Sequence, residues 1–137
     1  MEVFKKELDV MLKDDVVEPS MSDWQGAWVI VQKPKDPGKW RIAQDFRILN
    51  ERTVIERYPL PRIDQAIEEL SGCKYFTCMD IKSAFWQIRL GNPDDSKERQ
   101  EKVKDYTAFG SPWGQFRWKR MPMGLHSSPS TWQKCVN

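Results

Sequence analysis

The stretch CKYFTCMDIKSAFWQIRL, residues 73–90, places one acid inside a largely apolar run that is rich in strand-forming residues. This pattern predicts a strand over residues 74–81 that carries Asp80 near its end, followed after a turn by a second strand through residues 86–90. A carboxylate at the end of a buried strand costs several kcal/mol unless another group pairs with it. Asp80 is therefore either a structural acid that accepts backbone hydrogen bonds or a ligand for a cation.

Helices and hairpins are predicted on the N-terminal side of this stretch. Apolar residues recur at helical spacing over residues 2–14, which predicts an amphipathic helix. Residues 27–33 and 40–46 form two strands around the turn PKDPGK (34–39), and so predict a hairpin with a basic tip. Residues 63–70 predict a short helix that ends at Ser71-Gly72.

On the C-terminal side, the polar residues 91–105 predict a loop with at most a helical turn. YTAF (106–109) and GQFRWKRMP (114–122) predict a second hairpin around GSPWG, and a helix begins at Ser127 or Ser128 with Pro129 in its first turn. Together these elements predict an α+β fold.

The composition restricts the classes of protein. The chain has 137 residues, enough for one domain with a core or for part of a larger one. No run approaches the roughly 20 apolar residues of a membrane span and no signal peptide is visible, so we expect an intracellular protein, cytoplasmic or nuclear, with no membrane partner. The three cysteines fit no zinc pattern and are expected to be buried thiols. We interpret the one histidine, His126, as a surface or phosphate-proximal residue and not as a ligand.

The charge is unevenly distributed although the net charge is only +2. Residues 33–62 and residues 106–137 each carry an excess of four positive charges and several aromatic side chains. Such tracts suit a phosphate backbone with bases or sugars packed beside it. The alternative is solvated surface charge over an aromatic core.

Seven motifs occur in a fixed order: PSMSDW, WRIAQDFRILN, RYPLPRID, KYFTCMDIKSAFWQIRL, YTAF, MPMGL and SSPSTWQ. As an ordered set they resemble the N-terminal half of reverse transcriptases of gypsy-class LTR retrotransposons, which are related to retroviral and pararetroviral enzymes. The resemblance covers nearly the whole chain and implies a partial right-hand polymerase fold. Residues 1–62 are then fingers, 63–105 the first palm segment with the catalytic strand, and 106–137 the returning fingers hairpin with the start of a palm helix.

The resemblance implies that Asp80 is catalytic and that its carboxylate, with the backbone carbonyl of Ile81, contacts Mg²⁺. The family's second metal motif, an aromatic-X-Asp-Asp hairpin, lies beyond the helix that begins near Ser127. Asp94-Asp95 lacks the aromatic residue and the flanking apolar strands. We therefore expect Mg²⁺ binding to be weak or absent, because the two-metal reaction needs carboxylates from two motifs.

The resemblance also assigns binding residues. For the incoming nucleotide it implies Lys35 and Arg41 at the phosphates and Phe85 as the steric gate that favours deoxynucleotides, with Met123 at the pocket floor. For the template and primer it implies Arg47, Gly124 and Pro129. Any of the hairpin lysines Lys33, Lys35 and Lys39 fits the phosphate role or is a solvated tip charge, and we favour Lys35. For Phe85 the alternative is a core position.

Two functions remain open at this stage. The first is a fingers/palm segment of an RNA-directed DNA polymerase that binds primer–template and deoxynucleoside triphosphate (dNTP) and is inactive alone. The second is a domesticated, non-catalytic module that binds nucleic acid or protein. The sequence leaves open whether the chain is itself an enzyme. Where the remainder of a polymerase would sit, we expect an exposed apolar surface that favours self-association or a partner.

Overall fold

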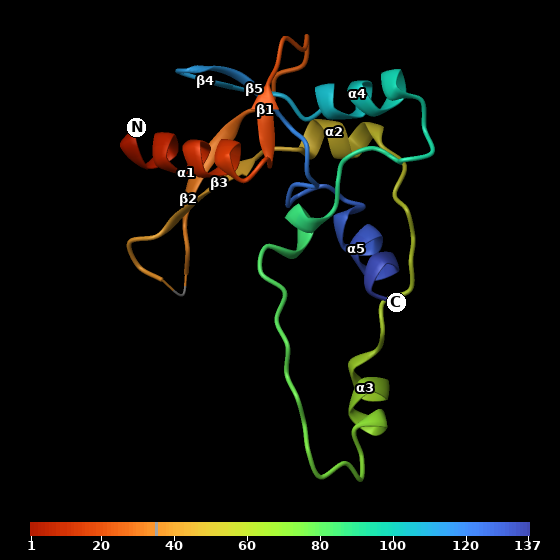
Figure 1. The fold of residues 1–137 in the computed structure, drawn as a ribbon. Helices are drawn as coiled ribbons and strands as arrows, with labels where there is room; N and C mark the ends of the chain where they lie inside the picture. Colours follow the sequence, from red (N-terminus) through yellow and green to blue (C-terminus); the bar gives the residue numbers. More distant parts are fainter. Residues whose placement is uncertain (35) are drawn as a thin grey trace.

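Two small antiparallel sheets lie side by side in the upper part of the molecule (Figure 1). The structure, a computed structural model, describes residues 1–34 and 36–137. One sheet has the strand order β1 (Val17–Pro19), β5 (Gly114–Trp118), β4 (Phe109–Ser111), and the other is the hairpin of β2 (Trp28–Gln32) and β3 (Trp40–Gln44). Both predicted hairpins are confirmed, with slightly different strand ends.

Helix α1 (Glu2–Lys13) covers the sheets with one apolar face, which confirms the helix predicted over residues 2–14. Phe4, Leu8 and Met11 are buried, because side chains three or four residues apart lie on the same side of a helix. They pack in one cluster with the buried apolar residues Val16, Val17, Phe46, Phe109, Phe116 and Trp118. The ring of Phe4 lies 3.8 Å from that of Trp28, centroid to centroid, and so joins α1 to β2.

The side chain of Gln44 links the two sheets. Its Nε2 donates to the carbonyl of Ala108 just before β4, at 3.2 Å, and its Oε1 accepts from Nε1 of Trp118 at the end of β5, at 2.7 Å. A backbone bridge between Gly26 and Phe109 joins the same sheets. The β2–β3 hairpin is therefore held against the three-stranded sheet by polar as well as apolar contacts.

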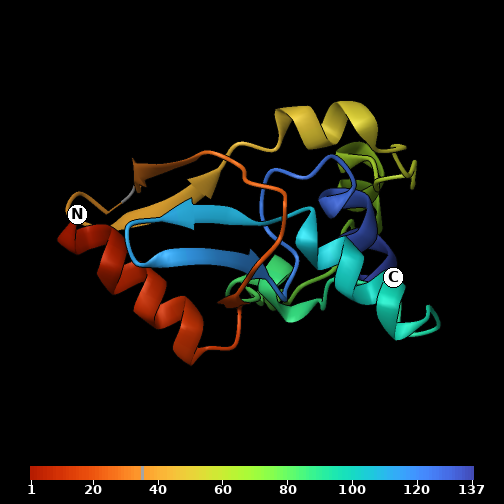
Figure 2. The ribbon, with the colours of Figure 1, turned by 90° about the horizontal axis from the view of Figure 1, so that it is seen from above.

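Three short helices lie at the opposite end of the molecule from the N-terminus (Figure 2). Helix α5 (Ser128–Val136) follows Ser127 and carries Pro129 in its first turn, as predicted. The segment expected to be a loop contains helix α4 (Lys97–Asp105). The Ser96 hydroxyl accepts a hydrogen bond from the Arg99 amide at 3.3 Å and so caps the start of this helix. Helix α2 (Arg47–Arg52) was not predicted. Among the described residues, no helix is long and apolar enough to cross a bilayer.

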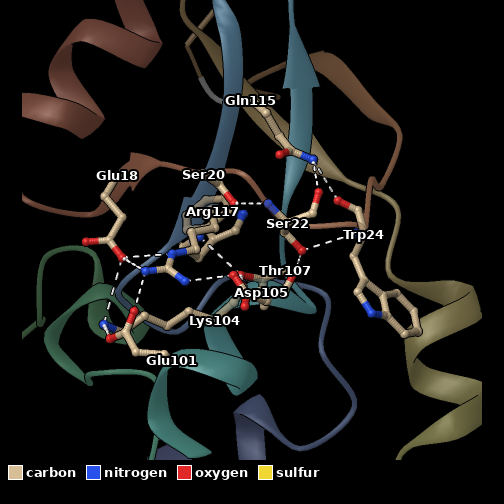
Figure 3. Close-up of polar contacts among 11 residues, drawn as sticks. Glu18, Ser20, Ser22, Trp24, Glu101, Lys104, Asp105, Thr107, Gln115 and Arg117 are labelled. Atoms are coloured by element: carbon tan, nitrogen blue, oxygen red, sulfur yellow. Dashed lines mark hydrogen bonds and ion pairs between the residues drawn. The ribbon is translucent and has the colours of Figure 1, made fainter. Parts of the chain in front are cut away.

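Arg117 on β5 ties α4 to the three-stranded sheet (Figure 3). Its guanidinium donates to Glu18 on β1 at 2.9 Å, to Asp105 at 2.7 Å, and to Glu101, the last two being residues of α4. Lys104 also contacts Glu101, at 2.6 Å. Because the Arg117 side chain is only 17% exposed, solvent screens these ion pairs less than pairs on the open surface.

Residues 53–83, which we call the arm, project away from the sheets (Figure 1). The arm contains α3 (Ile63–Glu69), which confirms the predicted helix, and every arm residue except Tyr58 is exposed. Its base is held to α5 by an ion pair between Glu56 and Lys134 and by a 3.0 Å hydrogen bond from Asn137 to the Tyr58 hydroxyl.

The prediction of a strand over residues 74–81 is wrong. This segment of the arm is irregular, and Asp80 is exposed rather than at the end of a buried strand. A strand needs a neighbour to pair with its backbone groups, and in the described part of the chain no strand lies beside this one.

Two further expectations are also wrong. A strand was expected over residues 86–90, but residues 84–87 form a short 3₁₀ helix, η1 (Ala84–Gln87). In the rest of that expected strand, residues 88–90, Arg89 alone makes a β-bridge, to Arg120. The three cysteines are exposed, because Cys73 and Cys78 lie on the arm and Cys135 lies near the end of α5.

Candidate nucleotide site

A hollow of about 590 Å³ lies between β3, η1 and the loop that follows β5. Its lining includes Arg41, Phe85, Met123 and Gly124, four residues predicted from the sequence to contact a nucleotide or its template. They come from three segments that are distant in the chain. The fold therefore brings this part of the predicted site together.

Arg41 supplies positive charge at the hollow. It is exposed on β3 while its neighbour Ile42 packs against the core, because successive side chains of a strand point to opposite faces. Its guanidinium lies 4.0 Å from the sulfur of Met123, another residue of the lining. Within residues 1–34 and 36–137, Arg41 forms no ion pair with an acid.

Of the hairpin lysines, Lys33 lines the hollow. The backbone amide of Lys33 donates to the carbonyl of Lys39 at 2.9 Å and closes the hairpin next to Arg41. Lys39 is instead paired with Asp36 at 2.5 Å. Lys35, which the sequence led us to favour, lies outside the described residues. Of the two hairpin lysines that the structure describes, Lys33 is thus the one that lines the same hollow as Arg41.

Aromatic rings form the inner wall of the hollow. Phe85 is half-buried on η1, and the next residue, Trp86, lies 6.4 Å from Trp118, centroid to centroid. Ser83, just before η1, has a left-handed backbone with φ of 50°. Three successive residues, Ala84 to Trp86, line the hollow because they belong to the short helix η1 and not to an extended strand, in which alternate side chains point to opposite faces.

The floor of the hollow is held by Asn50, a buried residue of α2 that sequence reasoning missed. Its Nδ2 donates to the Gly124 carbonyl at 2.8 Å, and its Oδ1 accepts from the His126 amide at 2.9 Å. Gly124 has φ of +99°, and a Cβ there would meet the ring of Phe46 at 3.4 Å. The one available signal was a polar residue at the end of the motif DFRILN.

Asp80 and Ile81 lie apart from this hollow. Both are exposed on the arm, and neither lines the hollow. Among the described residues there is no group of three or more acid, histidine or cysteine side chains that could hold a metal ion. His126 is exposed, and only its backbone takes part in the contact with Asn50.

Two of the three predicted template residues, Arg47 and Pro129, lie on helices, and the third, Gly124, lies in the loop that lines the hollow. Arg47, in the first turn of α2, forms a forked pair with Asp45 through Nε, at 3.0 Å to both carboxylate oxygens, and through one terminal nitrogen at 2.6 Å. Hydrogen bonds from the Arg47 side chain and backbone lower the pKa of Asp45 to about 2, so the pair stays ionised at neutral pH. Pro129 is exposed in the first turn of α5.

Comparison with known proteins gives consistent matches. A family model described as reverse transcriptase (RNA-dependent DNA polymerase) matches residues 31–137. The retrovirus-related Pol polyprotein from transposon 412 of Drosophila melanogaster is 33% identical over 140 residues, which is 99% of this chain and 11% of that protein. The corresponding polyprotein from transposon gypsy of the same fly is 35% identical over 136 residues, covering 96% of this chain and 12% of that protein. The chain spans about a tenth of the length of these relatives.

A solved structure shares the fold. The foamy viral protease-reverse transcriptase dRH in complex with double-stranded DNA matches with a TM-score of 0.71 at 24% sequence identity, over 98% of this chain and 21% of that one.

The Asn50 contacts predict a measurable stability effect. Asn50→Ala removes two hydrogen bonds to the Gly124–His126 loop, and the loss should lower the free energy of unfolding by about 1–2 kcal/mol. Asn92→Ala is the matched control, because the exposed Asn92 side chain accepts one local hydrogen bond, from Asp94 at 3.1 Å, and its loss should cost less than about 0.5 kcal/mol. Urea unfolding measures both. Equal losses for the two variants would contradict the role of Asn50 as the support of the floor.

Proposed function

Because this chain belongs to the reverse transcriptase (RNA-dependent DNA polymerase) family, we propose that it is the part of such an enzyme that binds dNTP and primer–template. The observation that carries the proposal is that Arg41, Phe85, Met123 and Gly124 line the same hollow. In this proposal residues 1–62 are fingers, 63–105 are the first palm segment, and 106–137 return through the fingers into a palm helix.

The relatives confirm the resemblance to gypsy-class and pararetroviral enzymes that the motifs indicated. A pararetroviral example is the enzymatic polyprotein of Cauliflower mosaic virus (strain Strasbourg). It is 31% identical over 135 residues, covering 97% of this chain and 19% of that protein. The fold comparison likewise confirms an α+β, partial polymerase fold. The activity of a whole polymerase is part of the proposal, since the chain spans only a small part of those proteins.

In the proposed nucleotide complex, Arg41 and Lys33 contact the phosphates. Guanidinium groups bind phosphate oxygens through two parallel hydrogen bonds, and a lysine adds a point charge. The ring of Phe85 packs against the sugar, where it leaves no room for a 2′ hydroxyl. Met123 and Gly124 lie under the nucleotide, at the floor that Asn50 supports.

For primer–template, we propose contacts from the two basic tracts, with Arg47, Gly124 and Pro129 near the template. The solved relative, foamy viral protease-reverse transcriptase dRH, is in complex with double-stranded DNA, which supports a nucleic-acid partner. Arg47 keeps one terminal nitrogen that Asp45 does not engage in the described structure, and this nitrogen remains available to a phosphate.

We propose that Asp80 and Ile81 form part of a Mg²⁺ site that the described residues alone do not complete. The Asp80 carboxylate and the Ile81 carbonyl are oxygen donors of the kind Mg²⁺ prefers, but they are only two. Two-metal chemistry needs further carboxylates around both ions. We therefore propose that this chain binds its substrates and supplies Asp80, and that further carboxylates must come from elsewhere before DNA synthesis can occur.

A second candidate is a module that binds nucleic acid or another protein without catalysis. The exposed apolar side chains of the arm favour it, with Val54 at 92%, Tyr75 at 94% and Met79 at 88% exposure. Exposed apolar surface of this extent is typical of a site for a partner or for self-association.

Primer extension distinguishes the two candidates from a self-sufficient enzyme. With a primed template, dNTPs and Mg²⁺, the 137-residue chain should give no detectable extension, because Asp80 alone offers one carboxylate. Asp80→Asn should change the free energy of unfolding by less than about 0.5 kcal/mol, as should the exposed control Asp94→Asn. Extension that is lost in Asp80→Asn would show that a second set of carboxylates is supplied, for instance by a dimer.

Salt dependence tests the nucleic-acid contact. Affinity for primer–template should fall steeply with salt and show little preference for sequence, because phosphate contacts release counterions. Arg47→Ala should reduce the slope of log K against log salt by about one. Arg99→Ala is the matched control, since Arg99 is also exposed and paired, with Asp95 at 3.4 Å, but lies outside both basic tracts. An equal change in both variants would count against Arg47 as a template contact.

A further inference from the structure

A second hollow, of about 580 Å³, adjoins the candidate nucleotide site. The two hollows share four lining residues, Glu7, Lys33, Ser83 and Trp86. Ser83 stands at the junction, where the left-handed turn separates Lys82, which lines the second hollow, from Ala84 and Phe85, which line the first.

The second hollow collects unpaired positive charge. Lys33 follows β2, Lys82 lies at the end of the arm, and Arg120 follows β5; all three line this hollow. Across the described ranges none of them forms an ion pair, whereas neighbouring Lys119 and Arg117 are paired with Asp15 and Glu18 respectively. Cations that line one hollow without acid partners raise its electrostatic potential and attract a compact anion.

Two acids, Glu7 on α1 and Asp14 directly after it, moderate this attraction. Glu7 and Asp14 line the same hollow, so its cations exceed its acids by one. The acids would repel an extended polyanion such as a nucleic-acid strand along that wall. A small anion needs contact with only part of this lining, so Lys82 and Arg120 can attract it.

We propose that this second hollow binds inorganic pyrophosphate on its way out of the nucleotide site. The inference rests on the proposed function, because nucleotidyl transfer is the reaction that releases pyrophosphate. The oxygen of the primer 3′ hydroxyl forms a bond to the α-phosphorus, and the bond from that phosphorus to the bridging oxygen breaks. Pyrophosphate leaves with the electron pair of that bond, and the hydroxyl proton passes to solvent.

Lys33 gives the path its continuity. It lines both hollows, so phosphate groups can keep one contact while they exchange Arg41, in the first hollow, for Lys82 and Arg120 in the second. In this arrangement the sugar and base stay at Phe85, while the released anion moves past Ser83. Product release is then separated in space from nucleotide binding.

Calorimetric titration of the 137-residue chain with inorganic pyrophosphate and, separately, with dTTP tests the inference. Lys82→Gln combined with Arg120→Gln should weaken pyrophosphate binding by roughly tenfold or more. Phe85→Ala, which affects only the first hollow, should weaken dTTP binding and leave pyrophosphate binding unchanged. Arg57→Gln combined with Lys97→Gln removes the same charge from exposed residues that line neither hollow, and should leave pyrophosphate binding unchanged. Urea unfolding confirms that each variant is folded.

Four results bear on the inference, and they separate it from the proposed function. Absence of pyrophosphate binding in a chain that binds dTTP would overturn the inference alone, and so would pyrophosphate binding that is weakened by Phe85→Ala and not by the Lys82/Arg120 double variant. Equal weakening by the double variant and by the charge-matched control would overturn it as well, since binding would follow net charge. Pyrophosphate binding that depends on Lys82 and Arg120, in a chain that does not bind dTTP, would uphold the anion site and contradict the proposed function.

Discussion

The link that Gln44 makes between the two sheets is the constraint on which the candidate site depends. A two-stranded hairpin is marginally stable by itself, so β2 and β3 need a surface to hold them. That surface is the three-stranded sheet, and Gln44 holds the hairpin to it through hydrogen bonds to Ala108, just before β4, and to Trp118 on β5. Gly26 is part of the same arrangement, because a Cβ there would lie 2.5 Å from the Gln44 amide nitrogen. Since Arg41 is three residues earlier on the same strand, this link sets its position over the hollow.

The candidate site is well supported at one end and not at the other. At the hollow, Arg41 and Phe85 stand on elements that pack against the core, and Asn50 fixes the loop of the floor with two hydrogen bonds. At the arm, Asp80 lies on an irregular, exposed segment whose backbone has no neighbouring strand among the described residues. The proposed binding of a nucleotide and the proposed catalytic role of Asp80 therefore have separate physical requirements in this chain.

Much of the fold could be predicted from local patterns. Helical spacing gave α1, and the turn residues between β-rich runs gave both hairpins, because these elements are specified by neighbours in sequence. The segment around Asp80 could not be predicted in this way, since its apolar, β-rich composition indicates a strand only if a partner strand is present. Asn50 was also out of reach, because its role depends on a contact across the fold, the bond to Gly124. The choice between Lys33 and Lys39 depends on which turn residue pairs with Asp36 and which side chain lines the hollow, and the sequence does not specify either. Lys35 lies outside the described residues, so its role stays a prediction.

The most direct test of the central claim, that the hollow beside Arg41 is a nucleotide site, is an NMR titration of the isotopically labelled chain with dTTP and with UTP. We predict that dTTP shifts the resonances of Arg41, Phe85, Met123 and Gly124 together, and that UTP, with its 2′ hydroxyl, does so only at much higher concentration. Shifts confined to exposed lysines, or equal responses to the two nucleotides, would contradict the claim.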